Sequence, residues 1–260
     1  MRNINQIMNL AQEISPLFLR YKTRKHEMKN ILGGIIWILV TGSQWHLLPR
    51  ENFPPKSTCY YWFEKFRKNN ILGIILFNLS SKNKKKKDYQ IKEAYIDATF
   101  SESKRGGDKI GGTKAGKGTK LFAIVSRDNR ILHLSLENAT PHESKFILPI
   151  IEKMPKKLKP LFLIGDKAYD SFPIKNQLQE LEVKLIAPNK INRINNRQDG
   201  RNLRRYKRRH IVENYFADLQ TFRRVIIRYE RKSENYLAFV KLAAICLNFW
   251  KFKIGMKIVA

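Results

Sequence analysis

The fold follows from one stretch of the sequence, Lys92-Glu93-Ala94-Tyr95-Ile96-Asp97-Ala98-Thr99-Phe100. Apolar residues at positions 94, 96, 98 and 100 alternate with Tyr95, Asp97 and Thr99. A period of two is typical of a half-buried β-strand, because successive side chains point to opposite faces of the sheet. The pattern therefore predicts a strand with Asp97 near its centre, facing away from the apolar set.

Two further carboxylates stand in informative positions. The apolar run 161–164, Leu-Phe-Leu-Ile, predicts a strand buried on both faces, and Gly165-Asp166 places an aspartate where that strand ends. Ligand sites in open α/β sheets lie at such carboxyl ends. The third, Glu213, follows Tyr206 and Arg209 at spacings of three and then four residues, which predicts that all three share one helix face.

Together, Asp97, Asp166 and Glu213 suit a site for divalent metal ions. Cutting or transferring a phosphodiester requires charge against the phosphate oxygens and deprotonation of water or a 3′-hydroxyl, and two cations about 3.5–4 Å apart provide both. Mg²⁺ prefers oxygen ligands and keeps water and substrate in its other positions, so three carboxylates suffice. Each acid also has a plain structural interpretation, since an aspartate after a strand often caps a helix and a glutamate in a basic helix often pairs with a cation.

The elements around these residues indicate an α/β fold. Besides the first strand and the strand at 161–164, strands are predicted at 120–125, 131–136 and 183–187. The turn at 127–130 makes the first three strands antiparallel. Helices are predicted at 143–153, after a cap at Asp170 or Ser171 with Pro173 in the first turn, and around Glu213, with an arginine-rich loop at 189–205 before it.

The first 80 residues are predicted to form a helical module. Apolar spacing favours a helix at 27–41 that stops at Gly42, and Ser57 is a good N-cap for a second helix at 58–68. A tight connection between them suggests a DNA-binding helix-turn-helix, although a plain helical bundle with a solvated basic rim fits equally well. The lysine-rich run at 80–87 is expected to be a solvated linker.

Charge and composition narrow the partners. With 51 Lys and Arg against 22 Asp and Glu, the formal charge is +29, which favours nucleic acid as the partner. The longest apolar run, 31–40, is too short to span a membrane, and no signal peptide is evident. Two cysteines, Cys59 and Cys246, do not make a disulfide framework, so reduced thiols in a cytoplasmic protein are expected.

Four stretches of the chain resemble the DDE transposases of bacterial insertion sequences, in the insertion-sequence-five family. The first is 41–49, Thr-Gly-Ser-Gln-Trp-His-Leu-Leu-Pro, with Ser-Thr-Cys-Tyr-Tyr at 57–61. The second is 95–99, Tyr-Ile-Asp-Ala-Thr, with the glycines and lysines of 111–120, and the third is 164–170, Ile-Gly-Asp-Lys-Ala-Tyr-Asp. The fourth is the spacing of Tyr206, Arg209 and Glu213.

The resemblance implies a ribonuclease-H-like, retroviral-integrase-like mixed sheet flanked by helices, behind an N-terminal helix-turn-helix-like module. We expect a helical DNA-end-binding module at 1–80, a basic linker at 81–92 and the catalytic domain at 93–254. Asp97, Asp166 and Glu213 would then be catalytic and would bind two divalent cations, Mg²⁺ or Mn²⁺. The partners would be double-stranded transposon ends and target DNA, and the protein would act in the bacterial cytoplasm, at the nucleoid, as a homodimer or larger synaptic complex.

Several residues are expected to support this site. Tyr206 and Arg209 could orient the scissile phosphate, although Arg209 could equally form a plain surface pair with Glu213. Lys120 lies in the glycine-lysine stretch. His142 would lie near the site by resemblance, while Thr140 to Glu143 also reads as a helix-capping box. The family usually has a DNA-contacting lysine six residues after the glutamate, where this chain has Gln220, and Arg223 could compensate.

Two other functions stay open on the sequence alone. One is a decayed transposase that only binds DNA, which Gln220 mildly favours and the intact triad opposes. The other is a structure-selective or RNA–DNA hybrid nuclease on the same fold, which would not need the N-terminal helical module.

Overall fold

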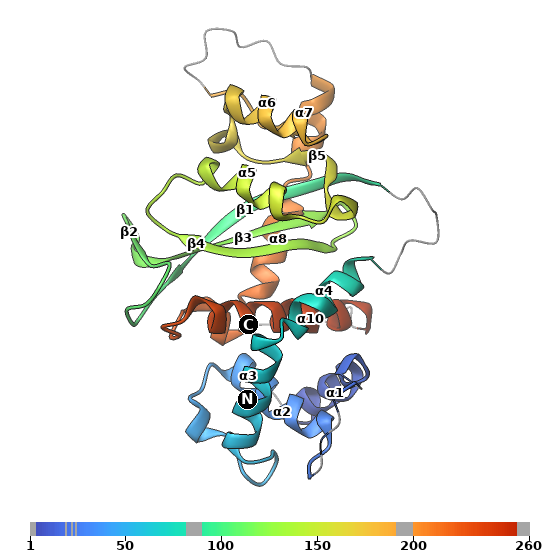
Figure 1. The fold of residues 1–260 in the computed structure, drawn as a ribbon, viewed down its shortest axis with the longest axis vertical. Helices are drawn as coiled ribbons and strands as arrows, with labels where there is room; N and C mark the ends of the chain where they lie inside the picture. The colour runs from blue at the N-terminus through green and yellow to red at the C-terminus, as the bar shows by residue number, and fades with distance from the viewer. Residues whose placement is uncertain are drawn as a thin grey trace. The chain divides into compact units, whose positions relative to one another are not determined.

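The computed structural model of the chain describes residues 4–18, 20, 21, 23, 25–81, 90–190 and 200–253. It divides into two compact units, a helical one and one built on a sheet (Figure 1). The helical unit consists of Met1–Leu79, Ser103–Asp108 and Asp218–Ala260, and the sheet unit of Ser80–Glu102 and Lys109–Ala217. Residues after 217 thus belong to the same compact unit as the N-terminal helices. The expected linker at 81–92 falls mostly outside the described residues.

The sheet is mixed, as predicted. Its strands run in the order β2-β3-β1-β5-β6, and β4 also pairs with β3. The central strand β1 (Ile91–Glu102) is antiparallel to β3 (Gly116–Ser126) and parallel to β5 (Pro160–Ile164). The others are β2 (Gly111–Thr113), β4 (Ile131–Asn138) and β6 (Lys184–Ile186). The parallel pair requires a crossover, which α5 (Ser144–Lys153) supplies.

The two faces of β1 are covered by different elements. Phe122 of β3 pairs with Ala98, so it lies on the apolar face, and its ring contacts Phe146 of α5. The opposite face carries Glu93, Tyr95 and Asp97, and the arginines before α8 (His210–Leu219) bind it. Because both faces are covered, Tyr95 is as fully buried as Ile96. The prediction of a half-buried strand is therefore wrong for its N-terminal half.

Most predicted elements of the sheet unit are confirmed, with two errors between residues 189 and 213. Residues 189–205 were expected to be loop, but α7 (Gly200–Tyr206) is a helix, and 191–199 lie outside the described residues. Residues 206–213 do not form one helix either, since α7 ends at Tyr206 and α8 begins at His210. Ser171 caps α6 (Phe172–Glu180) by position, but its side chain makes no capping hydrogen bond. Two short 3-10 helices complete the unit, η3 (Lys156–Leu158) and η4 (Lys167–Tyr169).

The helical unit is organised around the buried helix α2 (Met28–Thr41). It packs on α1 (Ile4–Ile14), α3 (Lys56–Lys68) and α9 (Arg223–Ile226). Gly34 permits the close approach of α3, since a Cβ at this position would lie 2.8 Å from the sulfur of Cys59. The unit also contains η1 (Ser15–Phe18), η2 (Trp45–Leu47), most of α4 (Ile71–Ser81) and the long α10 (Ser233–Lys253).

The ends of α2 and α3 test three predictions. Gly42 does end α2, in the left-handed conformation with φ 71°, and its N–H donates to the carbonyl of Ile38. Ser57 is not the N-cap of α3, because the helix begins at Lys56 after Pro55. The connection between the helices spans residues 42–55 and contains η2, so it is longer than the tight turn that was expected.

Two compositional predictions can also be compared with the structure. Cys59 and Cys246 are free thiols and both are buried. Among the helices of the described ranges, none combines the length and the hydropathy that a membrane span requires.

Candidate active site

Strand pairing brings Asp97 and Asp166 to the same place. Tyr95 of β1 lies beside Ile164, the last residue of β5, in the parallel register, and each aspartate comes two residues later in the chain. Both carboxylates therefore stand where β5 ends, at the carboxyl edge at which α/β sheets bind ligands. The sequence predicted Asp97 near the centre of one strand and Asp166 at the end of another, and the register of β1 with β5 joins the two positions.

Asp97 is a largely buried carboxylate. Its side chain is 19% exposed, and one of its oxygens accepts the N–H of Ala98 at 2.9 Å. Burial raises the pKa of Asp97 to about 6, against the lowering effect of the Ala98 N–H and of Arg209. The carboxylates of Asp166 and Glu143 raise this pKa further. Asp97 thus lies among acidic groups that together favour a cation.

Asp166 is fixed by the short helix that follows β5. Its side chain accepts the N–H of Ala168 at 2.8 Å, so it caps η4. Gly165 allows this turn to sit tightly, because a Cβ there would lie 2.6 Å from Cδ2 of the buried Tyr169. The capping interaction that was the alternative explanation for Asp166 is thus present. This capping bond occupies Oδ1 of Asp166 and does not involve Oδ2.

Glu213 reaches this group through Arg209. One nitrogen of the Arg209 guanidinium donates to Asp97 at 3.2 Å, and the other donates to Glu213 four residues along. Burial alone would lower the pKa of Arg209, but the charges of Asp97 and Glu213 raise it overall. The guanidinium also lies 5.8 Å from the ring centre of Tyr206. Arg209 is therefore more than a surface partner of Glu213, since it joins two of the three carboxylates.

A second set of arginines clamps the segment before α8 onto β1. Arg205 and Arg208 both donate hydrogen bonds to the buried Glu93. The bond from Arg208 Nη2 to Glu93 Oε2 is 3.2 Å long. Arg208 also donates to the hydroxyl of Tyr95 at 3.3 Å. Glu93, Tyr95 and Asp97 alternate along one face of β1, so residues 205–209 are held against three successive positions of that face. This clamp sets where Arg209 and Glu213 lie relative to Asp97.

Two other expected residues, Lys120 and His142, make contacts of their own. Lys120 donates to the carbonyl of Pro141 at 2.8 Å and lies 3.8 Å from Glu143. Glu143 accepts the hydroxyl of the buried Tyr169 at 3.1 Å, and burial is the main cause that raises the pKa of Tyr169. Exposed His142 contacts the hydroxyl of Ser144 at 2.8 Å.

The expected capping box at Thr140 to Glu143 is wrong. Glu143 has helical φ and ψ and makes no capping hydrogen bond, and Thr140 donates to Gly112 at 3.4 Å instead. The reason is tertiary, because Tyr169 and Lys120 take the carboxylate that would have turned back on the helix. Gln220 and Arg223 are both exposed, and both belong to the helical unit.

The three carboxylates are of the right type to bind hard cations, but they are not gathered around one ion position in this structure. Asp97, Asp166 and Glu213 offer only oxygen ligands, as Mg²⁺ and Mn²⁺ prefer. Within the described ranges, no three acidic, histidine or cysteine side chains lie close enough to hold one ion. The Arg209 guanidinium lies between Asp97 and Glu213 and pairs with both carboxylates.

Residues of the clamp were missed from the sequence. Glu93 lies four residues before Asp97 and so shares its strand face, which is a signal that the period of two already contained. Arg205 and Arg208 gave no comparable signal, because their partners are more than a hundred residues away in sequence and α7 was not expected.

Comparison with known proteins agrees with this fold. Residues 89–249 match the model of the family described as "Transposase DDE domain", and residues 10–76 match "Putative transposase of IS4/5 family". A putative transposase for insertion sequence element IS402 from Burkholderia cepacia is 26% identical over 145 residues, and the match covers 53% of this chain and 65% of that protein.

A solved structure with a similar fold is that of the piggyBac transposase synaptic complex with hairpin DNA. It has a TM-score of 0.50 and 9% sequence identity, and the alignment covers 100% of this chain and 78% of that one. The similarity concerns the fold alone, and with the mixed sheet it supports the ribonuclease-H-like architecture. With more than half of its length matched by the family model, the chain belongs to the family of transposases with a DDE domain.

Proposed function

We propose that the chain is a DNA transposase that cuts DNA at the ends of its insertion sequence and joins the freed strands to target DNA. Asp97, Asp166 and Glu213 would hold two divalent cations, Mg²⁺ or Mn²⁺. When bound, the cations supply charge against the phosphate oxygens and lower the pKa of the attacking water or 3′-hydroxyl. The observation that carries the proposal is the placement of Asp97 and Asp166 at one strand edge, with Arg209 linking Asp97 to Glu213.

Arg209 has a defined part in this proposal. In the protein without DNA, its guanidinium forms ion pairs with Asp97 and Glu213. A planar guanidinium with two donor edges also suits a phosphate group. We expect Arg209 to exchange one carboxylate for the scissile phosphate when DNA binds, with Tyr206 beside it. Lys120 lies against Glu143 and would add positive charge near the same phosphate.

The remaining parts of the proposal concern partners. A formal charge of +29 gives strong, sequence-independent attraction to DNA. The helical unit would bind the terminal inverted repeats, with Gln220 and Arg223 as candidate contacts, and His142 of the sheet unit is a further candidate contact near the DNA. Two ends must be brought together, so the active form would be a homodimer or larger complex in the bacterial cytoplasm. The match to the IS402 relative covers only 65% of that protein, so these properties are inferred for this chain and not carried over.

The test is strand cleavage and strand transfer on a labelled duplex that ends in the element's inverted repeat. The protein is compared with Asp166→Asn, and Glu180→Gln serves as the control because Glu180 is an exposed acid on α6. We expect nicking at the repeat end that needs Mg²⁺ or Mn²⁺, is lost in Asp166→Asn by at least a thousandfold and is retained in Glu180→Gln. Metal-independent nicking, or equal nicking by Asp166→Asn, would contradict the proposal.

Two observations favour a second function, that of a protein which binds DNA without cutting it. Arg209 already satisfies Asp97 and Glu213, and Gln220 replaces the lysine that the family usually has. This function predicts tight binding to the repeat with no nicking in either metal. Removing the guanidinium with Arg209→Ala would then restore no activity.

A further inference from the structure

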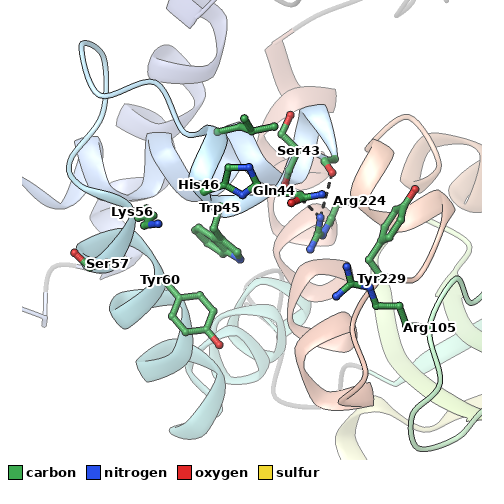
Figure 2. Close-up of a pocket in the computed structure, with 12 residues that line it drawn as sticks. Ser43, Gln44, Trp45, His46, Lys56, Ser57, Tyr60, Arg105, Arg224 and Tyr229 are labelled. Carbon is green, nitrogen blue, oxygen red and sulfur yellow. Dashed lines mark hydrogen bonds between the residues drawn. The ribbon is translucent and has the colours of Figure 1, made fainter.

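The helical unit contains a pocket of about 750 Å³ that the active-site chemistry does not use (Figure 2). Its walls come from η2, from the start of α3, from the loop after β1 and from the segment around α9. Trp45 and Tyr60 lie on one side of it, Arg105 and Tyr229 lie on the other, and Arg224 lies between them. The pocket is within the size range of small-ligand sites, far smaller than a duplex.

Aromatic rings give this pocket stacking surface. Tyr60 is 42% exposed and Tyr229 is 40% exposed, which is unusual for two large rings lining one cavity. Trp45 packs edge to face on Tyr60, with ring centres 5.4 Å apart, and it also contacts Phe63 and Phe239 of the core. Exposed rings held by a packed core can stack on a flat ligand at little entropic cost.

Arg224 lines the pocket with its charge already paired. Arg224 is buried and donates to Glu230 at 2.7 Å and to the carbonyls of Gly42 and Ser43 at 3.1 and 3.3 Å. Its charge is therefore used inside the protein. The guanidinium therefore links the end of α2, just before η2, to the segment around α9.

Positive charge at the rim comes from exposed groups. Lys56 begins α3, and Arg105 lies in a loop that is fixed by backbone bonds from Lys104 to Arg228 at 3.1 Å and from Asp108 to Arg231 at 3.3 Å. No acidic residue lines the pocket in the described part of the chain. Rings with cations at their edge form the combination that binds a base together with its phosphate.

From this arrangement we propose that the pocket binds an unpaired nucleotide of DNA, with its base against Tyr60 and Tyr229 and its two flanking phosphates toward Lys56 on one side and Arg105 on the other. A paired base keeps both faces within the duplex stack, so only an extruded or single-stranded base can offer a face to these rings. The inference rests on the proposed function in taking DNA as the ligand. It adds that the helical unit distinguishes an unpaired end from intact duplex.

The test measures binding of the full-length protein, in EDTA, to two labelled duplexes of equal length. One is blunt and the other carries three unpaired thymidines at its 3′ end. We expect about tenfold tighter binding of the tailed duplex. The double variant Tyr60→Ala/Tyr229→Ala should lose this preference and keep its affinity for the blunt duplex. Tyr61→Ala is the matched control, since Tyr61 is a 59% exposed neighbour on α3 that does not line the pocket.

A second measurement locates the base directly. Ultraviolet cross-linking of 5-bromouracil in the tail should map to peptides that contain Trp45, Tyr60 or Tyr229. Arg105→Gln should weaken the tail preference without altering the melting temperature. Equal binding of tailed and blunt duplexes by the unchanged protein, a preference that survives the double variant, or free thymidine monophosphate that competes as well as the tailed duplex would each overturn the proposal.

These outcomes separate the inference from the proposed function. Metal-dependent nicking with no tail preference would sink the pocket proposal alone. A tail preference that depends on Tyr60 and Tyr229, with no nicking, would leave the pocket proposal standing and would contradict strand cleavage.

Discussion

Asp97 carries its negative charge at a cost to folding when no cation is bound. Burial holds its pKa at about 6, above the ordinary value near 3.9, so the folded protein binds a proton more readily than the unfolded chain. Below the unfolded pKa the group is neutral in both states and costs nothing. The cost grows as the pH rises and is complete above pH 6.

The substitution Asp97→Asn should therefore stabilise the metal-free protein. In EDTA at pH 8 we expect the free energy of unfolding to rise by about 1–2 kcal/mol, less than the full shift implies because the side chain remains partly exposed. At pH 4 the gain should vanish. Urea denaturation at both pH values measures this, with Glu180→Gln as the control. A gain of the same size at both pH values would mean that charge is not its cause.

We expect Glu93 to influence the proposed reaction only indirectly, through the two arginines that it binds. It is buried, and Arg205 and Arg208 both depend on it. Glu93→Gln removes the charge but keeps the shape, so we expect a loss of about 2 kcal/mol in stability, since one side of a mostly buried ion pair is left without its partner. Nicking under single-turnover conditions should slow at least tenfold while affinity for the repeat stays unchanged.

A second substitution distinguishes a positioning role of Glu93 from a role in stability alone. Glu93→Asp retains the charge with a shorter reach, so it should recover stability more than nicking rate. Glu152→Gln, at an exposed acid on α5, serves as the control. If nicking followed stability in step across the variants, the clamp would have no role in positioning.

At the scale of elements, the turn from β5 into η4 is the tightest part of the site. A Cβ on Gly165 would lie 2.6 Å from Tyr169 and 3.2 Å from Ile96, both of which are fully buried. Gly165→Ala should cost about 1–3 kcal/mol through overpacking and should displace Asp166. Gly112→Ala is the matched control, because nothing lies within 4 Å of a Cβ there. Equal thermal melting of the two variants would contradict this account of the turn.

Elements with a strong local pattern could be predicted from sequence, whereas those formed by distant contacts could not. The alternation of residues 92–100 and the apolar run at 161–164 predicted β1 and β5. By contrast, α7 is rich in arginine and has no apolar period, and it is held by Arg205 on Glu93 and on the ring of Phe162, 4.0 Å away. The break between α7 and α8 follows from the same clamp, which fixes residues 205–209 along β1.

The candidate site shows the same division. Each carboxylate could be identified by its neighbours in sequence, and the register of β1 with β5 then places Asp97 beside Asp166. The role of Arg209 could be predicted only in part, because the sequence shows only that Glu213 lies four residues after it, where the two can pair on a helix. Its bond to Asp97 and the engagement of Glu143 by Tyr169 both depend on tertiary packing. A local pattern therefore predicted a capping box at Glu143 that the fold does not use.

At the scale of the whole molecule, charge should dominate DNA affinity. The formal charge of +29 favours contacts to DNA phosphates. If the protein contacts about six phosphates, its affinity for DNA should fall about a thousandfold when the salt concentration rises from 50 to 200 mM. Fluorescence anisotropy on a duplex of unrelated sequence measures this slope. The inverted repeat should show the same slope at a higher affinity, because base contacts add little salt dependence. Affinity that stays constant over this salt range would exclude phosphate contacts as its main source.

The central claim is that Asp97, Asp166 and Glu213 act as one site, although Arg209 stands between two of them. The most direct measurement is single-turnover nicking by Asp97→Asn, by Glu213→Gln and by the double variant of both. Residues that act as a unit lose activity together, so the account predicts a loss of at least a thousandfold in each single variant and no further loss in the double variant. Near-normal nicking by Glu213→Gln, or losses that multiply in the double variant, would contradict it.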